Sequence, residues 1–339
     1  MKVFYVLCPA KYETGGTELA HQLVDFMINS GYECYMVYFD NNDFVSSEVP
    51  IGFQKYNILV KETIEDNKNN CIIIPETFLF FSKRFKNAYL IFWWMSFDNY
   101  LKRAGVIDIF KYYFKGLFNT KSLFVKLYFF NINKSISLNR IKHIEKKRIL
   151  HLYQSRYASD MLLKNNIYKQ LPLSDYINTE FTNSLDLKNT KKENLVLYNP
   201  SKGYEITLKI KKLLPDIKFI ELKGLSRNNL NKLFQKAKLY IDFGNHPGKD
   251  RLPREACING CCIIVGKNGS ASYFEDVPIS DNYKFDNSDL TGIKNRILDI
   301  FENYEERSLD FTFYRSKINK EKEIFFNEIS EFINYINSL

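Results

Sequence analysis

The sequence of 339 residues has no apolar run that approaches the ~18–20 residues needed to cross a bilayer as a helix. We therefore expect no membrane-spanning segment. The first residues, MKVFYVLCPA, are too short for a signal peptide and lead into a glycine-containing loop, so they predict a β-strand. Together these two absences predict a cytoplasmic protein.

Cysteine is sparse, and the six cysteines of the chain lack CxxC spacing. Most of them lie in apolar stretches that predict strands or helices, which is typical of buried thiols in a reducing compartment. We expect core thiols and no metal site. The sequence also lacks an RNA-binding motif of the usual kinds.

The composition is that of a folded protein, with 45% hydrophobic and 26% charged residues. The length is sufficient for two α/β domains, each with its own core. The net charge of +9 favours an anionic partner, which could be a nucleotide, a membrane surface or a nucleic acid.

Residues 238–278 predict strand, loop, short helix, strand, loop and helix in that order, with Pro253 at the start of the first helix. The first loop, GNHPGKDRLP, and the residue after it supply three cations: Lys249, Arg251 and Arg254. Two neighbouring strand-to-helix turns form a crevice at the carboxyl edge of a parallel sheet, where open α/β sheets bind ligands. Helix N-termini and cations favour a phosphate there.

This stretch resembles the donor-sugar site of GT-B glycosyltransferases, especially the retaining family 4 group, which includes enzymes of bacterial surface polysaccharide synthesis. In that group a Glu in the pattern E-A-x-x-x-G-x-x-I/V-V holds the nucleotide ribose, and REACINGCCIIV places Glu255 there. The family commonly has a second Glu, with seven residues between the two. That position is Pro247 here, so the first Glu is replaced by an HPGKD loop.

A second similarity follows the predicted strand 194–198, which leads into NPSKG. This resembles the family's strand end R-x-x-x-x-K-G, where the Lys contacts the donor pyrophosphate. Lys202 matches that Lys, whereas Leu197 stands in place of the Arg. We expect Lys249, Arg251 or Arg254 to supply the second cation.

The resemblance implies an α/β fold of the GT-B class: two Rossmann-like, doubly wound domains facing a cleft, with the C-terminal helix crossing back to the first domain. Residues 1–180 would form the acceptor-side domain together with helix 315–339, and residues 190–314 the nucleotide-sugar-binding domain. The predicted strand, Gly-Gly turn and helix at the N-terminus match the opening βαβ unit of such a fold.

The candidate residues follow from the carboxyl ends of the predicted strands and from the resemblance. The expected donor-binding residues are Gly15, Gly16, Thr17, Asn199, Lys202, His246, Gly248, Lys249, Asp250, Arg251, Arg254, Glu255, Gly269 and Ser270. The expected acceptor-binding residues are Glu18, Glu76, Trp94, Ser96 and Asp98. The candidates for catalysis are Lys202, Lys249, Arg251 and Asp98.

The function that the resemblance implies is transfer of a sugar from a nucleotide-diphosphate sugar to a glycan or lipid-linked glycan, in lipopolysaccharide or capsule synthesis and with retention. Since the sequence has no DxD motif, we expect no metal and no other cofactor. Two alternatives stay open. One is an inverting enzyme with Asp98 or Glu76 as its base. The other is a non-catalytic glycan- or nucleotide-binding protein, which the missing Glu favours.

Residues 101–148 contain twelve Lys or Arg residues but only two carboxylates, for a local charge of +10, with many Phe and Tyr between them. This pattern predicts an interfacial segment that binds an anionic membrane surface. A solvated helical insert is the second interpretation and a nucleic-acid surface the last. We therefore expect a peripheral protein at the inner face of the cell membrane, with no nucleic acid as partner.

Overall fold

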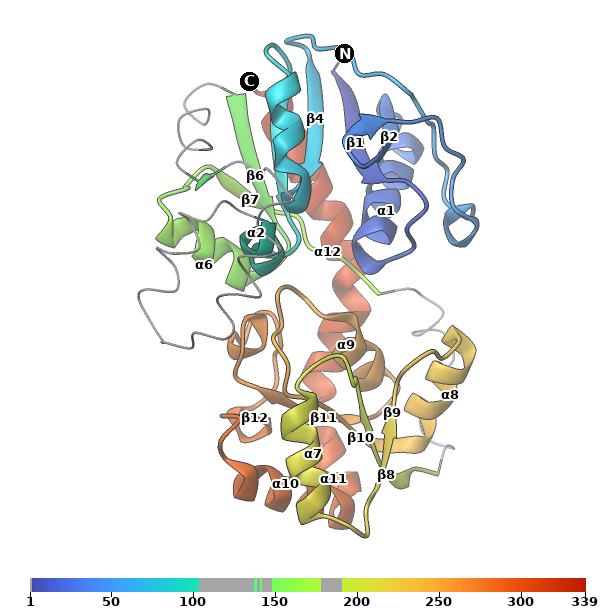
Figure 1. Ribbon diagram of the computed structural model, residues 1–339, viewed down its shortest axis with the longest axis vertical. Coiled ribbons are helices and arrows are strands. Elements are labelled where there is room, and N and C mark those ends of the chain that lie inside the picture. The colour runs from blue at the N-terminus through green and yellow to red at the C-terminus, as the bar shows by residue number, and fades with distance from the viewer. Residues whose placement is uncertain (1, 104–136, 139–140, 142–147, 178–190) are drawn as a thin grey trace. The chain divides into compact units, whose positions relative to one another are not determined.

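The computed structural model describes residues 2–103, 137–138, 141, 148–177 and 191–339 (Figure 1). The chain divides into two compact units. Unit 1 comprises Met1–Ser174 and Phe325–Leu339, and unit 2 comprises Asp175–Ile324. Within the described ranges, no helix combines the length and the apolar character that a membrane crossing requires. Most of the basic segment 101–148 lies outside the described residues.

Unit 1 is built on a seven-stranded sheet in the order β3-β2-β1-β4-β5-β6-β7. Only β3 pairs in the antiparallel sense. The strands are β1 (Val3–Pro9), β2 (Cys34–Asp40), β3 (Asp43–Phe44), β4 (Asn70–Pro75), β5 (Tyr89–Trp94), β6 (Ile149–Tyr153) and β7 (Gln170–Pro172). The strand order reverses between β1 and β4, so their carboxyl ends form the switch point of this sheet.

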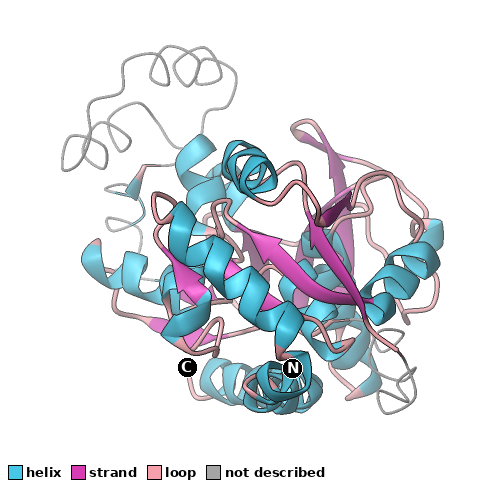
Figure 2. Ribbon diagram, turned by 90° about the horizontal axis from the view of Figure 1, so that it is seen from below, coloured by secondary structure: helices cyan, strands magenta, loops and turns pink. Residues whose placement is uncertain are grey.

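The helical elements of unit 1 connect these parallel strands. Those within the described residues are α1 (Gly15–Asn29), η1 (Ile51–Phe53), η2 (Glu76–Arg84), α2 (Phe97–Arg103) and α6 (Arg156–Lys164). In Figure 2 helices lie on both sides of the magenta strands. This covering explains why the central strands read as continuous apolar runs, since both faces of a parallel sheet are buried.

Unit 2 contains a five-stranded parallel sheet in the order β12-β11-β10-β8-β9. Its strands are β8 (Glu193–Tyr198), β9 (Lys218–Glu221), β10 (Ala237–Asp242), β11 (Cys262–Gly266) and β12 (Lys284–Phe285). Strand β8 has β9 on one side and β10 on the other, so the strand order reverses between β8 and β10, which form the switch point of this sheet.

The helical elements of unit 2 are α7 (Tyr204–Leu213), α8 (Arg227–Lys236), α9 (Arg251–Ile258), η4 (Ser270–Ser272), η5 (Asp281–Tyr283), α10 (Leu290–Glu302), α11 (Tyr304–Leu309) and α12 (Thr312–Asn337). Two predictions need correction. Helix α9 begins at Arg251 rather than at Pro253. The helix expected after the GKNGS turn is only the short η4, which ends where Tyr273 adopts an extended conformation.

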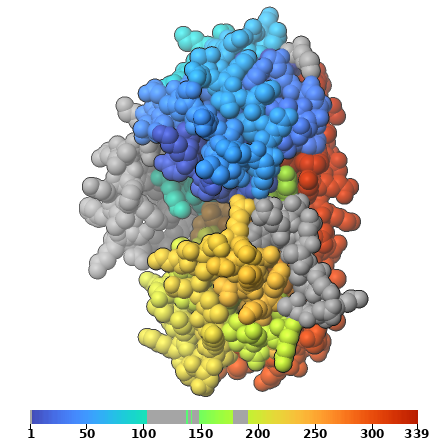
Figure 3. Space-filling view, turned by 90° about the vertical axis from the view of Figure 1, so that its right-hand side faces the viewer, coloured from blue at the N-terminus to red at the C-terminus, as the bar shows by residue number. Residues whose placement is uncertain are grey.

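The C-terminal helix α12 supplies residues to both units, as expected for a helix that returns to the first domain. In unit 1 its Phe332 packs edge-on against Phe4, with ring centroids 6.0 Å apart. Its Glu328 accepts a hydrogen bond of 2.7 Å from the backbone N–H of Ser174. Residues 315–324, expected with the first domain, pack in unit 2. Part of α12, red in Figure 3, is visible at the surface of each unit.

The expectation of core thiols is confirmed. All six cysteines are buried and unpaired. Burial raises the pKa of the Cys257 thiol to about 12, so this thiol is protonated at neutral pH.

Candidate functional site

At the switch point of unit 2, the loop after β8 touches the loop after β10. Gly203, between β8 and α7, has a φ of 59°. A Cβ atom at this position would lie 2.4 Å from the backbone carbon of Phe243, which no side chain tolerates. A glycine is therefore required for the close approach of the two loops.

The loop after β11 is fixed against the loop after β10. Gly269 has a φ of 58°, and a Cβ atom there would lie 2.1 Å from the carbonyl oxygen of His246. The next residue, Ser270, donates from its backbone N–H to the same carbonyl (2.8 Å) and from its hydroxyl to the carbonyl of Gly248 (2.6 Å). Ser270 is fully buried, and its two hydrogen bonds hold the HPGKD loop in place.

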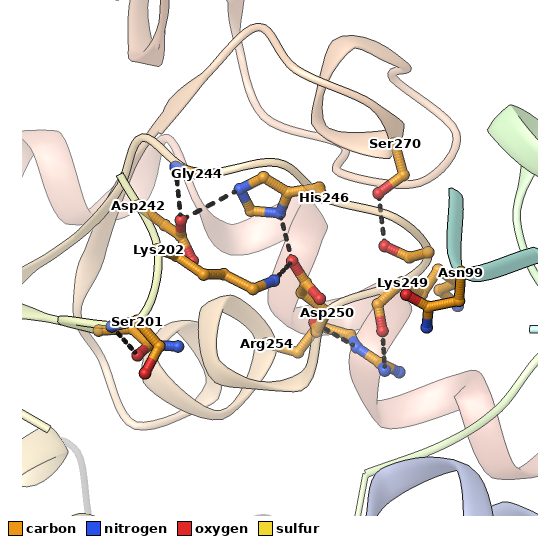
Figure 4. A network of polar contacts seen from close by, with 12 residues as sticks. Asn99, Ser201, Lys202, Asp242, Gly244, His246, Lys249, Asp250, Arg254 and Ser270 are labelled. Carbon is orange, nitrogen blue, oxygen red and sulfur yellow. Dashed lines mark hydrogen bonds and ion pairs between the residues drawn. The ribbon is translucent and has the colours of Figure 1, made fainter. Parts of the chain in front are cut away.

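Four charged or titratable side chains meet under these loops (Figure 4). Lys202 Nζ forms an ion pair with Asp250 Oδ2. The same oxygen lies 2.8 Å from His246 Nδ1, and His246 Nε2 lies 3.6 Å from Asp242 Oδ1. Asp242 also accepts a hydrogen bond of 3.1 Å from the hydroxyl of Tyr240. The result is a connected network that leads from β10 to the end of β8.

Burial and neighbouring charges shift the pKa values of three groups in this network. Burial opposes protonation of His246, but its contacts with the Asp250 and Asp242 carboxylates raise its pKa above the ordinary value. Burial likewise opposes ionisation of Asp250, yet the His246 hydrogen bond and the charge of Lys202 hold its pKa below the ordinary range. Burial raises the pKa of Asp242.

Arg254 does not lie where the sequence analysis places it. Its guanidinium is buried and donates to Asp175 (2.6 Å), to Glu321 (2.9 Å) and to the carbonyl of Lys249 (3.0 Å). With 1% of its side chain exposed, Arg254 presents no surface to a donor pyrophosphate. We therefore remove it from the donor-binding residues: it holds α9 and the preceding loop in place.

The other two cations of this region each face a carboxylate. Lys249 Nζ lies 3.4 Å from Glu321 Oε1, and Arg251 Nε lies 3.8 Å from Glu255 Oε1. Glu255 lies one turn into α9 and is mostly buried. The turn after β8 is shaped by Asn199, whose side-chain oxygen accepts from the N–H of Ser201 at 3.0 Å. That these four residues (Lys249, Arg251, Glu255 and Asn199) bind the donor stays a prediction.

In unit 1, the expected donor residues Gly15, Gly16 and Thr17 open helix α1. The hydroxyl of Thr17 accepts from the N–H of Thr14 at 2.8 Å, as one half of a reciprocal cap. Glu18 is buried and accepts a hydrogen bond of 3.1 Å from the hydroxyl of Tyr56. The side chains of Thr17 and Glu18 thus anchor the helix start.

The expected acceptor residues of unit 1 follow β4 and β5. Glu76 accepts a hydrogen bond of 3.2 Å from the N–H of Met95. Ser96 Oγ accepts one of 3.1 Å from the N–H of Asn99. Asp98 accepts one of 2.6 Å from the hydroxyl of Tyr157. The first contact joins the ends of β4 and β5, the second lies within the start of α2, and the third joins α6 to α2; the role of these residues in acceptor binding stays a prediction.

Trp94 requires a correction. It is fully buried, its indole N–H donates to His151 Nδ1 at 2.9 Å, and its ring stacks on Phe97 with centroids 5.6 Å apart. A side chain in this position belongs to the core of unit 1 and has no face on which a sugar could stack. We therefore remove Trp94 from the acceptor-binding residues.

The sequence analysis misses three carboxylates, at Asp242, Asp175 and Glu321. Asp242, His246 and Asp250 follow one another at intervals of four residues, which is a visible signal. In a loop with two prolines and two glycines, however, that spacing predicts no common face. Asp175 and Glu321 are remote in sequence from Arg254, so no local pattern pairs them.

No family model matches the sequence. No curated protein matches it either. Among solved structures, the chain is similar to HepE (Alr3699) of Anabaena in complex with UDP-glucose, at 11% identity and a TM-score of 0.59, over 99% of this chain and 100% of that one. It is similar to sucrose-phosphate synthase from Thermosynechococcus elongatus, at 10% identity and a TM-score of 0.63, over 100% of both chains.

A glycosyltransferase from Rickettsia africae matches 98% of this chain over 98% of its own length, at 12% identity and a TM-score of 0.60. At such identities the likeness concerns the fold. This likeness confirms the expected GT-B fold class, and so do the two α/β units, each built on a mainly parallel sheet, and the C-terminal helix that contributes to both.

Proposed function

We propose that the chain is a glycosyltransferase that moves a sugar from a nucleotide-diphosphate sugar to a glycan or lipid-linked glycan. Three structural neighbours support the proposal: one was solved with UDP-glucose, and two are a sucrose-phosphate synthase and a glycosyltransferase. The fold alone does not specify the chemistry, because one fold carries many activities. The argument therefore depends on the switch point of unit 2.

The observation that carries the proposal is the position of Lys202. It lies in the turn after β8, at the switch point, and its ammonium pairs with Asp250, the N-cap residue of the helix α9 that carries Glu255. Open α/β sheets bind nucleotides at this place. An ammonium group has three donors, so a pair with Asp250 is compatible with a further bond to a phosphate oxygen. We assign the donor diphosphate to Lys202 and the ribose to Glu255.

The chemistry we propose is stabilisation of the departing diphosphate. Negative charge grows on the diphosphate as the glycosidic bond breaks, so a cation placed there binds the transition state more strongly than the donor. Lys202 is the principal cation in this account, and Lys249 and Arg251 are the candidates for a second. These cations would take the place of a metal ion. We propose retention of configuration, which demands little acid–base work from the protein.

We also propose that the acceptor binds to unit 1, near Glu76, Ser96 and Asp98, and that it belongs to lipopolysaccharide or capsule synthesis. The basic segment 101–148 is the basis for placing the enzyme at an anionic membrane surface. This part of the proposal depends on the sequence and on the resemblance alone.

The test is release of nucleoside diphosphate from a panel of UDP-, GDP- and ADP-sugars, with and without a lipid-linked oligosaccharide fraction. We expect release from one donor, with loss of that release in Lys202→Ala. The matched control is Lys212→Ala, at an exposed lysine near the end of α7. Tight donor binding without release under any condition would favour a non-catalytic binding protein, and absence of both would contradict the proposal.

A further inference from the structure

The polar network under the loops of unit 2 runs from the interior of the sheet to its carboxyl edge. His246 is fully buried and Asp242 is 2% exposed. At the other end, the side chains of Asp250 and Lys202 are 20% and 25% exposed. A ligand can therefore reach the network at its Lys202 end, whereas His246 acts on that ligand only through its neighbours.

Each ring nitrogen of His246 faces a carboxylate. Its Nδ1 lies 2.8 Å from Asp250 Oδ2, and its Nε2 lies 3.6 Å from Asp242 Oδ1. At 3.6 Å the contact with Asp242 is an ion pair rather than a hydrogen bond. An imidazolium turns an N–H and a positive charge toward both carboxylates, whereas a neutral imidazole has a single N–H. A buried carboxylate that loses its partner is left with a large desolvation cost.

The groups that face His246 come from three elements. Asp242 ends β10, Asp250 precedes α9, and Lys202 precedes α7. The loop after β11 contributes the backbone N–H of Ser270, which donates to the carbonyl of His246. Two carboxylates thus flank the ring on opposite sides, and Lys202 pairs with the outer one.

We infer that His246 is a positioning residue for Lys202: its imidazolium fixes the Asp250 carboxylate, and Asp250 in turn fixes the Lys202 ammonium that binds the donor diphosphate. The inference rests on the proposed function, because it concerns the same diphosphate site. Its specific content is that His246 contributes to binding of the diphosphate but not of the nucleoside.

The same three side chains could instead bind a divalent cation, since ligand atoms of Asp242, His246 and Asp250 lie within 4.8 Å of one another. A metal would bind a ring nitrogen through its lone pair and would therefore displace a proton from the imidazolium. A cation in this position would also repel the neighbouring Lys202 ammonium. The experiments below must distinguish a bound metal from an imidazolium between the two carboxylates.

The first experiment is a double-mutant cycle with His246→Gln and Lys202→Ala, in which calorimetry measures the affinity for UDP and for uridine, with GDP and guanosine in parallel. Gln places its amide near the Nε2 position and leaves Asp250 without its donor. We expect about tenfold weaker diphosphate binding in His246→Gln, from one charged hydrogen bond, and unchanged nucleoside binding. His246→Asn, which keeps a donor toward Asp250, should lose less.

In the Lys202→Ala background, His246→Gln should change diphosphate affinity by less than about twofold, since its effect passes through Lys202. Equal, multiplicative losses in both backgrounds would overturn the inference while leaving the proposed function intact. If no nucleoside diphosphate binds the wild-type protein, the proposed function and the inference fail together. Loss of nucleoside binding in His246→Gln would indicate a merely structural role.

The second experiment tests the charge of the ring without any nucleotide. In a protein with ¹⁵N-labelled histidine, the signal lost in His246→Asn should show both ring nitrogens protonated at pH 7. His21 and His151, whose pKa values are lowered by burial, should be neutral there. A neutral His246 would overturn the inference, as would a stoichiometric metal in the purified protein whose removal by EDTA weakens UDP binding.

Discussion

The two units of the molecule differ in the candidate residues that follow their parallel strands. In unit 2 the candidate residues are the cations Lys202, Lys249 and Arg251, with an ion network beneath them. In unit 1 they are the carboxylates Glu76 and Asp98, which accept hydrogen bonds from neighbouring strand ends and helices. Each of these cations pairs with one carboxylate and retains further N–H donors that suit a diphosphate, so we call this the cationic edge of unit 2. A carboxylate edge suits the hydroxyl groups of an acceptor, to which it can act as hydrogen-bond acceptor or base.

The largest effect we expect is on stability, at the buried ion cluster that supports the cationic edge. Arg254→Ala leaves the buried Asp175 without its partner and Glu321 with Lys249 alone, and removal of one member of a buried pair costs about 3–5 kcal/mol. Chemical denaturation of the variant measures this loss. The control is Lys232→Ala, at an exposed lysine of α8. A stability equal to wild type would mean that Arg254 is available to bind the donor after all.

Lys202→Ala should cause the largest loss of catalysis. If the cationic edge stabilises the leaving diphosphate, turnover should fall about 100-fold or more, the usual cost of removing one transition-state donor. The Michaelis constant for the donor should rise less than turnover falls. Steady-state kinetics of nucleoside diphosphate release give both values. Turnover equal to that of the Lys212→Ala control would show that this lysine stabilises no leaving group.

Glu255→Gln should act on donor binding. Two ribose hydroxyls donating to an ionised carboxylate contribute about 1.5–3 kcal/mol each, and the amide keeps only part of this. We expect the affinity for the nucleotide to fall at least about tenfold in calorimetry. The thermal unfolding curve is the control, because Glu255 also faces Arg251 inside unit 2. Unchanged nucleotide affinity would remove Glu255 from the site.

Asp98→Asn tests the carboxylate edge. The amide oxygen can still accept from Tyr157, so the local structure is preserved while the base is lost. A retaining enzyme in which Asp98 only orients the acceptor should lose less than about tenfold in turnover. A loss of about 100-fold or more, together with an inverted anomeric centre in the product by NMR, would identify Asp98 as the base of an inverting enzyme.

The sequence predicts the parallel α/β architecture well, because turn glycines and apolar strands are local signals. It fails where the partner is remote. Arg254 has the local pattern of a phosphate ligand, yet it pairs with Asp175 and Glu321, which are 79 and 67 residues away. It fails at Trp94 for another reason. The strands of a covered parallel sheet are apolar on both faces, so alternation does not tell which side chain points outward.

The smallest effect per residue is expected for the basic segment 101–148. Each Lys or Arg near an anionic surface contributes about 1 kcal/mol at most, and salt screens it. We expect co-sedimentation with anionic vesicles that weakens as salt rises, and its loss when Lys111, Lys115, Lys121 and Lys126 are changed to Glu. Nucleotide binding should be unaffected in that variant. A wild-type protein that ignores anionic vesicles at low salt would point to a soluble acceptor.

The most direct test of the account is a crystal structure with the nucleoside diphosphate whose release the donor panel detects. We predict that its diphosphate lies within hydrogen-bond distance of Lys202 Nζ, with ribose hydroxyls on Glu255, at the switch point between β8 and β10. A nucleotide bound at the carboxyl ends of β1 and β4 instead would contradict the assignment of the donor to the cationic edge.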